Sequence, residues 1–303
     1  MTKHIFWISS FPKSGNTLLR AIISSLFFSD DGYFNFKMLN NVPIIEDTKN
    51  LEFIKKKFPN DYDNINRIDV LSKYWLDIQT KENLKFKGDF MFVKTHHALV
   101  KIYENPFTIE ENTRGIIYIV RDPRDVVLSL SNHFNFSMKK SLESLFDQNF
   151  FLKWNDTPNN FLDKKRPLSY VSSWEDHYLS WNSHSFKCPK LIIKFEDLVD
   201  KKAEVIYKLV NFFYENYGFK FSNLEEKILN IVNSTDFNKL KDEEFKYGFD
   251  ESVNKNFFNI GRKNQWINKL KKEDVLQIEK KITKILEKHQ YEIKFYNKKT
   301  ESI

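Results

Sequence analysis

Apolar residues along the chain alternate between short strand-like runs and longer stretches with helical spacing. The first run, at 5–8, is β-branched and aromatic, and the apolar positions of 18–26 then recur every three or four residues. Further strand-like runs lie at 90–93, 115–120 and 191–195. Strands that alternate with helices are typical of a parallel sheet. We therefore predict a three-layer α/β fold, with a central parallel sheet flanked by helices.

The remaining pattern adds helices and one irregular region. Helical spacing marks these stretches: 68–78, 170–183, 223–240 with a break near 234–237, and 272–288. Asp122 as an N-cap and Pro123 at the first helical position predict that another helix begins there. Residues 30–63 are polar and predict loops and short helices. No repeat or linker is visible, so we expect one domain over 1–303, with its motifs in 5–270 and a C-terminal helix and tail in 272–303.

The turn after the first strand, residues 12–17 (Pro-Lys-Ser-Gly-Asn-Thr), has the materials of an anion site. It can aim backbone N–H groups and an ammonium at an anion above a helix N-terminus. Ordinary turn chemistry also places Pro and Gly between a strand and a helix, so that alternative stays open here. The turn is not a Walker A loop, because Lys13 precedes Gly15 instead of following the second glycine.

Three predicted strand ends carry side chains suited to anion chemistry. Lys13 follows the first strand, Lys94 and His96 follow the second, and Arg121 follows the third. In a parallel sheet the ligand crevice lies outside the carboxyl ends of the strands. We therefore expect these residues to meet at one site.

Composition narrows the choice of partner and compartment. Lys and Arg number 48 against 41 Asp and Glu, a net charge of +7, without the basic block of a nucleic-acid arm. Small anions therefore fit better than nucleic acid. Cys188 is the single cysteine, which suits a reducing compartment, so we expect a cytoplasmic protein. We expect no leader and no membrane span, because the first strand starts near Met1 and no apolar run approaches the roughly 18 residues of a span.

The motifs, taken in order, resemble those of the cytosolic-type sulfotransferases, which use 3′-phosphoadenosine 5′-phosphosulfate (PAPS). Residues 12–17 resemble the family's 5′-phosphosulfate loop, and 94–96 (Lys-Thr-His) resemble its catalytic segment. Residues 121–129 (Arg-Asp-Pro-Arg-Asp-Val-Val-Leu-Ser) resemble its 3′-phosphate element. The resemblance implies a P-loop nucleotide-kinase-like fold and a PAPS-dependent sulfotransferase.

The resemblance implies that His96 is the general base for the acceptor hydroxyl, while Lys13 and Lys94 balance charge on the transferring group. If the chain is extended here, Lys94 and His96 share a face and His97 points the other way, which favours His96. Neutral imidazole dominates at pH 7 for an unperturbed histidine. From the residues alone, a hydrogen-bonded histidine near a strand end remains the alternative.

The same resemblance implies two phosphate sites. The 5′-phosphosulfate would be held by backbone and side-chain donors of the loop, which are Lys13, Ser14, Gly15, Asn16 and Thr17. The 3′-phosphate would be held by the Arg121 guanidinium and the Ser129 hydroxyl. A surface ion pair remains the alternative for Arg121, and a hydroxyl bonded within its own helix remains that for Ser129.

Three further segments match the family less fully. Phe195 stands at a tyrosine of the family and keeps only the stacking capacity near adenine. Thr235 and Phe237 resemble a segment that touches the adenine ring. In the loop that wraps the 3′-phosphate, Gly261 matches but Asn259 replaces an arginine. The missing charge would then come from a neighbouring residue, Arg262 or Lys263.

The sequence leaves the acceptor open. We expect a hydroxyl of a small alcohol, lipid or glycan, with residues 30–70 and 135–168 as the walls of its pocket, and no required metal. Two other functions remain: a Mg²⁺-dependent phosphotransferase, which lacks support because the Walker lysine is missing, and a nucleotide-binding protein without catalysis. The oligomeric state stays unpredicted.

Overall fold

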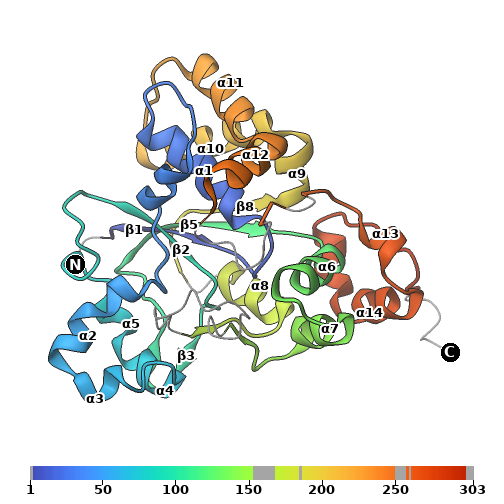
Figure 1. Cartoon of the computed structure of the whole chain (residues 1–303), viewed down its shortest axis with the longest axis horizontal. Coiled ribbons are helices and arrows are strands. Elements are labelled where there is room, and N and C mark those ends of the chain that lie inside the picture. Colours follow the sequence, from blue (N-terminus) through green and yellow to red (C-terminus); the bar gives the residue numbers. More distant parts are fainter. Residues whose placement is uncertain (1–2, 153–167, 184–185, 250–256, 259–260, 298–303) are drawn as a thin grey trace.

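A computed structural model describes residues 3–152, 168–183, 186–249, 257–258 and 261–297. Its centre is a four-stranded parallel sheet in the order β2-β1-β5-β8 (Figure 1). The four strands are β1 (Ile5–Ser9), β2 (Met91–Thr95), β5 (Thr113–Val120) and β8 (Lys190–Lys194). All four were predicted from their apolar runs, so the strand pattern is confirmed.

Alternate residues of β1 enter different layers. Phe6 and Ile8 pack in a cluster with the helices α1 (Asn16–Phe28), α10 (Lys202–Tyr217) and α11 (Leu224–Ser234). Trp7 packs on the other side, in a cluster with α6 (Pro123–Phe134), α8 (Trp174–Asn182) and α14 (Lys272–Lys288). Because side chains alternate across a strand, the two clusters lie on opposite faces of the sheet (Figure 1). The predicted three-layer α/β fold is confirmed.

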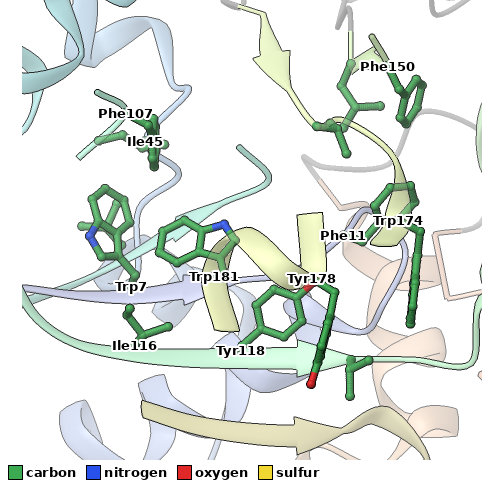
Figure 2. Packing of buried hydrophobic residues seen from close by; sticks show 14 of the residues in the cluster. Trp7, Phe11, Ile45, Phe107, Ile116, Tyr118, Phe150, Trp174, Tyr178 and Trp181 are labelled. Carbon is green, nitrogen blue, oxygen red and sulfur yellow. The ribbon is translucent and has the colours of Figure 1, made fainter. Parts of the chain in front are cut away.

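Aromatic rings fill both interfaces. Trp7 lies beside Phe107 and Trp181, with ring centroids 5.4 and 6.1 Å apart (Figure 2). On the opposite face, Phe6 makes edge-to-face contacts with Phe213 and Tyr217 at 5.4 and 4.8 Å. Such rings bury large areas and gain about 0.5–1.5 kcal/mol per pair beyond that burial. Phenylalanine, with 30 residues in the chain, thus contributes to the packing on both faces of the sheet.

Shorter elements connect these layers. They are η1 (Phe36–Asn41), η2 (Thr48–Leu51), α2 (Glu52–Lys57), α3 (Pro59–Tyr62), α4 (Ile68–Leu71), η3 (Ser72–Tyr74), α5 (Trp75–Ile78), β3 (Lys101–Ile102), β4 (Asn105–Pro106), α7 (Met138–Phe146), β6 (Phe151–Leu152), β7 (Ser169–Tyr170), α9 (Phe195–Asp200), α12 (Phe237–Tyr247) and α13 (Trp266–Lys269). None of the helices in the described part of the chain is long and apolar enough to cross a membrane.

Two predicted boundaries were wrong. The helix expected from 170 begins only at Trp174, because Ser172 has a positive φ of 64° and the Ser173 hydroxyl caps the helix by accepting from the Asp176 N–H. Phe195 does not end a strand but starts α9. The helix predicted over 68–78 is broken into three short pieces. By contrast, Asp122 caps α6 as predicted.

The C-terminal segment is tied to the start of α6. Glu279, fully buried in α14, accepts from the backbone N–H groups of Phe295 and Tyr296 at 2.8 and 2.9 Å. The same carboxylate bonds Arg124 at 2.8 Å, and Arg124 also binds Asp122. Buried charges are stabilising only when paired and hydrogen-bonded in this way. The network therefore fixes the end of β5, where one side of the candidate site begins.

Candidate active site

A cavity of about 350 Å³ opens beside the carboxyl ends of β1, β2 and β5. Most of the residues predicted from sequence line it: Lys13, Gly15, Asn16, Thr17, Lys94, His96, Arg121, Ser129, Phe195, Thr235, Phe237 and Gly261. They come from stretches more than 200 positions apart in the chain. The structure thus brings the three predicted strand ends to one place.

Three predicted residues do not line this cavity in the described structure. The Ser14 hydroxyl is buried beneath the loop, and it has no hydrogen-bond partner among the described residues. The Arg262 side chain is exposed, and its carbonyl faces inward to accept from Arg121. Lys263 forms an ion pair with Asp200 at the surface. Neither residue proposed to replace the missing loop arginine therefore places its charge in the cavity.

The loop between β1 and α1 is shaped to receive an anion. Lys13 and Gly15 both have positive φ, 67° and 99°. The Asn16 amide anchors the loop by donating to the Ile8 carbonyl at 3.2 Å and to the Ser10 hydroxyl at 3.1 Å. The first turn of α1 holds no acidic residue, and no side chain caps it among the described residues. The start of the helix therefore carries no side-chain charge that would repel a phosphate or sulfate oxygen.

Gly15 and Phe195 are in close contact. A methyl group at Gly15 would overlap Cδ2 of the Phe195 ring and lie 3.3 Å from Cδ1 of Ile119. The Arg121 guanidinium also lies near the Phe195 ring, 4.3 Å from its centroid. Phe195, which was expected to lie beside an adenine, therefore packs against both the loop 12–17 and the Arg121 guanidinium.

Arg121 joins two loops at the cavity. It is only 6% exposed, which removes the alternative of a surface ion pair. One guanidinium nitrogen donates to the Lys13 carbonyl at 3.0 Å and another to the Arg262 carbonyl at 3.2 Å. Its Nε has no partner among the described residues. Ser129 lies two turns further along α6 and lines the same cavity, so one guanidinium and one hydroxyl are available for an anion there.

Asp125 has a role that sequence reasoning missed. Its carboxylate accepts from the backbone N–H of Asn264 at 2.7 Å and of Trp266 at 3.0 Å. Burial raises the pKa of Asp125, although the Arg121 guanidinium opposes this shift. The carboxylate thus positions the loop that starts at Gly261, a residue with φ of 56° whose added methyl would overlap the Phe237 ring. Asp125 was expected only to be a helix N-terminal charge.

Lys94 and His96 line the cavity as the strand alternation predicted, while His97 does not. The His96 ring contacts the Ser10 carbonyl through Nδ1 at 2.8 Å. A carbonyl oxygen only accepts, so Nδ1 carries the proton and Nε2 keeps its lone pair. Burial, together with the Lys94 and Lys13 ammonium groups, lowers the pKa of His96 well below its ordinary value. The imidazole is therefore neutral at neutral pH.

Glu46 lies behind this strand and was not singled out from the sequence. Its carboxylate accepts from the Thr95 hydroxyl at 2.9 Å and from the His96 N–H at 3.1 Å. Burial raises the pKa of Glu46, but the Lys94 ammonium and His97 outweigh it and hold the pKa below its ordinary value. The signal in the sequence was an acid that directly follows the apolar run 42–45.

Two further histidines are structural. His97 Nδ1 accepts from the Tyr170 N–H at 3.0 Å, and burial lowers the pKa of His97 to about 4. His177 Nε2 bonds the His96 carbonyl at 3.2 Å, while its Nδ1 bonds the Tyr118 hydroxyl at 2.9 Å. These contacts hold the backbone of the Lys94–His96 segment in place.

Two titratable side chains that the motifs did not mark also line the cavity. His133 lies on α6, and burial together with the Lys13 ammonium lowers its pKa to about 2. Lys202 lies at the start of α10, and burial lowers its pKa to about 8. Of the ranges expected to form acceptor walls, 30–70 contributes no described lining residue and 135–168 contributes Leu152. Residues 153–167, within the second range, lie outside the described residues.

Among the residues described here, no group of three or more His, Cys, Asp or Glu side chains could hold a metal ion. The donors that meet in the cavity are instead ammonium, guanidinium, hydroxyl and backbone N–H groups, which bind phosphate and sulfate oxygens. The unpaired, buried Nε of Arg121, a residue that lines the cavity, is consistent with such a ligand.

Comparison with known proteins identifies the class. A model of the sulfotransferase domain family matches residues 3–290, so the chain belongs to this family. The resemblance found in the motifs, and the PAPS-dependent sulfotransferase that it implied, are thereby confirmed. No curated protein matches the chain by sequence.

Solved structures show the same fold. Mouse sulfotransferase SULT7A1 complexed with PAP is similar with a TM-score of 0.58 at 17% identity, covering 94% of this chain and 84% of that one. Retinol dehydratase with androsterone and the inactive cofactor PAP gives 0.55 at 18%, covering 94% and 81%. Retinol dehydratase with retinol and PAP gives 0.58 at 17%, covering 98% and 84%. The expected P-loop nucleotide-kinase-like fold is confirmed.

Proposed function

We propose that this sulfotransferase moves the sulfuryl group of PAPS in line onto an acceptor hydroxyl, with His96 as general base. PAPS supplies the sulfuryl group and departs as the 3′,5′-bisphosphate PAP. The observation that carries the proposal is the His96 ring, which is bonded through Nδ1 to the Ser10 carbonyl and lines the same cavity as Lys13 and Lys94. Its Nε2 lone pair takes the acceptor's proton as the acceptor oxygen bonds to sulfur.

The basic side chains in the cavity have two roles in this proposal, stabilising the transferring group and binding the nucleotide phosphates. Lys13 and Lys94 stabilise negative charge that develops on the transferring group and on the bridging oxygen. The N–H groups of 14–17 bind the 5′-phosphosulfate. Arg121 and Ser129 bind the 3′-phosphate. Both line the cavity, and the Arg121 guanidinium joins the loop 12–17 to the loop at Gly261 through the Lys13 and Arg262 carbonyls.

The acceptor is an alcohol, for which small alcohols, lipids and glycans all qualify. Part of the cavity wall is apolar and is formed by Phe134, Leu152 and Phe257. Such a wall suits an acceptor with an apolar body. The retinol and androsterone bound to the similar retinol dehydratase agree with this class. We also propose that 1–303 is a single domain without a required metal. The lone Cys188 supports a cytoplasmic location.

The test combines turnover with nucleotide binding. His96→Ala should reduce sulfuryl transfer by about 100-fold or more, because general base catalysis typically contributes 10²–10⁴-fold. PAP affinity should stay within about threefold, since His96 acts on the acceptor. Calorimetric titration with PAP and transfer from radiolabelled PAPS across acceptor classes measure the two effects.

Arg121→Ala should instead lower PAP affinity by about 10- to 100-fold, because it removes a charged hydrogen-bond donor. The matched control is Arg262→Ala, which removes an exposed guanidinium and keeps the carbonyl that faces the cavity. Unchanged turnover in His96→Ala, or equal affinities for the two arginine variants, contradicts the assignment. Loss of activity in EDTA favours the phosphotransferase alternative.

A further inference from the structure

The Lys13 side chain lies over an aromatic ring in the wall of the cavity. Its Nζ is 4.4 Å from the centroid of the Phe257 ring, and both residues line the cavity. A cation over a ring face is attracted by the negative charge of the π system, and the attraction grows where water is excluded. Lys13 follows β1 and Phe257 follows α12, so the contact depends on how distant parts of the chain fold together.

The Phe257 ring is held by its backbone and by neighbouring rings. The buried Glu244 carboxylate accepts from the backbone N–H groups of Phe257 and Phe258 at 2.5 and 2.8 Å. The rings of Phe249, Phe258 and His133 lie 4.9, 5.1 and 5.6 Å from the Phe257 ring, each steeply inclined to it. These contacts limit how far the ring can turn away from the ammonium.

The backbone of Lys13 is fixed separately from its ammonium. Its φ of 67° lies in the left-handed region, which an L-residue keeps only where its surroundings hold it. The Arg121 guanidinium donates to the Lys13 carbonyl at 3.0 Å. The side chain beyond the backbone is a flexible four-carbon stem, so a contact at its far end is needed to keep the ammonium in one place.

With its ammonium on this ring, Lys13 remains close to the proposed base. Burial and the Lys94 ammonium lower the pKa of His96, and the Lys13 ammonium adds to this effect. Burial and the Lys13 ammonium also lower the pKa of His133, whose ring lies beside Phe257. The position that the ring gives to the ammonium is therefore compatible with a role at the reaction centre.

We propose that Phe257 is a positioning residue for sulfuryl transfer, because its ring holds the Lys13 ammonium where negative charge develops on the transferring group. This inference rests on the proposed function, which gives Lys13 that charge to stabilise. A cation that is already in place stabilises a transition state without the cost of reorganisation. An aliphatic side chain would fill much of the same space without attracting the cation, so the aromatic ring is the essential feature.

Fluorinated phenylalanines at position 257 test the role of the ring face. Fluorine withdraws electrons from the ring and so weakens its attraction for a cation, while the shape of the side chain changes little. Turnover with PAPS should fall stepwise from one to three fluorines. PAP affinity should stay within about threefold of wild type, because PAP lacks the sulfuryl group that Lys13 faces.

Two ordinary substitutions complete the series. Phe257→Leu removes the π face and should lower turnover about 5- to 30-fold, whereas Phe257→Tyr keeps that face and should lose much less. Phe245→Leu is the matched control on α12, because Phe245 is 89% exposed, and its turnover should equal that of wild type. Equal turnover across the fluorinated series, or a loss of PAP affinity that parallels the loss of turnover, overturns the proposal.

A second measurement does not depend on the reaction. In protein without nucleotide, the Phe257 ring current should move the NMR resonance of the Lys13 ε-methylene to high field, and Phe257→Leu should abolish this displacement. An unchanged Lys13 resonance in Phe257→Leu overturns the contact itself. If the displacement is present but wild-type protein transfers no sulfuryl group from PAPS, the proposed function fails and the catalytic role of Phe257 fails with it, while the contact stands.

Discussion

Gly15→Ala tests whether the phosphate loop depends on its contact with Phe195. Gly15 has φ of 99°, and a left-handed conformation costs an L-residue roughly 1–2 kcal/mol. The added methyl would also overlap the Phe195 ring and lie 3.3 Å from Ile119. The ring cannot move away easily, because it is only 6% exposed and the Arg121 guanidinium lies 4.3 Å from its centroid.

Overpacking of this kind typically costs about 1–3 kcal/mol. Added to the backbone strain, it gives an expected loss of about 2–5 kcal/mol in the free energy of unfolding. Gly218→Ala is the matched control, because Gly218 has φ of 70° and no atom lies within 4 Å of its added methyl. That variant should lose only the roughly 1–2 kcal/mol of backbone strain.

Urea denaturation followed by tryptophan fluorescence measures both variants. The difference between them reports the contact with Phe195. In the background Phe195→Leu, which shortens the side chain beside Gly15, this difference should shrink, since neighbours in contact are not additive. Equal losses at Gly15 and Gly218, or a difference that Phe195→Leu leaves unaltered, would refute the argument.

Two other predictions concern charge and protonation. Glu46→Gln keeps an acceptor for Thr95 and His96 but removes the negative charge that faces the buried Lys94 ammonium. Turnover should therefore fall by at least about tenfold, while PAP affinity should change little. Glu104→Gln, at an exposed position, is the control. Unchanged turnover in Glu46→Gln contradicts this role. Burial lowers the pKa of His177 in the folded protein to about 3. In the unfolded chain this histidine binds a proton already as the pH falls below about 6.5. The stability that neutral His177 contributes above that pH is therefore lost as the pH falls toward 3. The melting temperature should therefore decline between pH 6.5 and 5 less steeply in His177→Gln than in wild type; parallel profiles would exclude this contribution.

Local features were predictable because their causes lie within a few residues. The Asp122 cap accepts from the N–H of Arg124, two positions away. α14 has the predicted bounds because its apolar spacing repeats from end to end, although a kink at Ile282 interrupts the helix. The boundary at α8 was wrong because a positive φ at Ser172 and the cap at Ser173 ended the helical pattern, which the apolar stripe alone does not reveal.

Part of the candidate site was predictable from the sequence and part was not. Alternation along β2 determined from the sequence that Lys94 and His96 share a face, and the motif order determined that Lys13 and Arg121 meet at strand ends. Motif matching also extended the prediction to Arg262 and Lys263, whose charges lie outside the cavity. Arg262 and Lys263 directly follow the matched Gly261, but that position in the sequence did not determine where their side chains point.

Only the tertiary structure decided which residues far apart in the sequence are hydrogen-bond partners. The Glu46 carboxylate meets the His96 N–H from 50 positions away, and Asp125 holds Trp266 from 141 positions away. The Lys202 ammonium donates to the Thr235 carbonyl from 33 positions away. Helical spacing, strand alternation and capping depend on neighbours within a turn or two, so the sequence determined the layers and the strand-end chemistry. Hydrogen bonds between distant segments depend on how those layers pack, and packing alone placed these groups together.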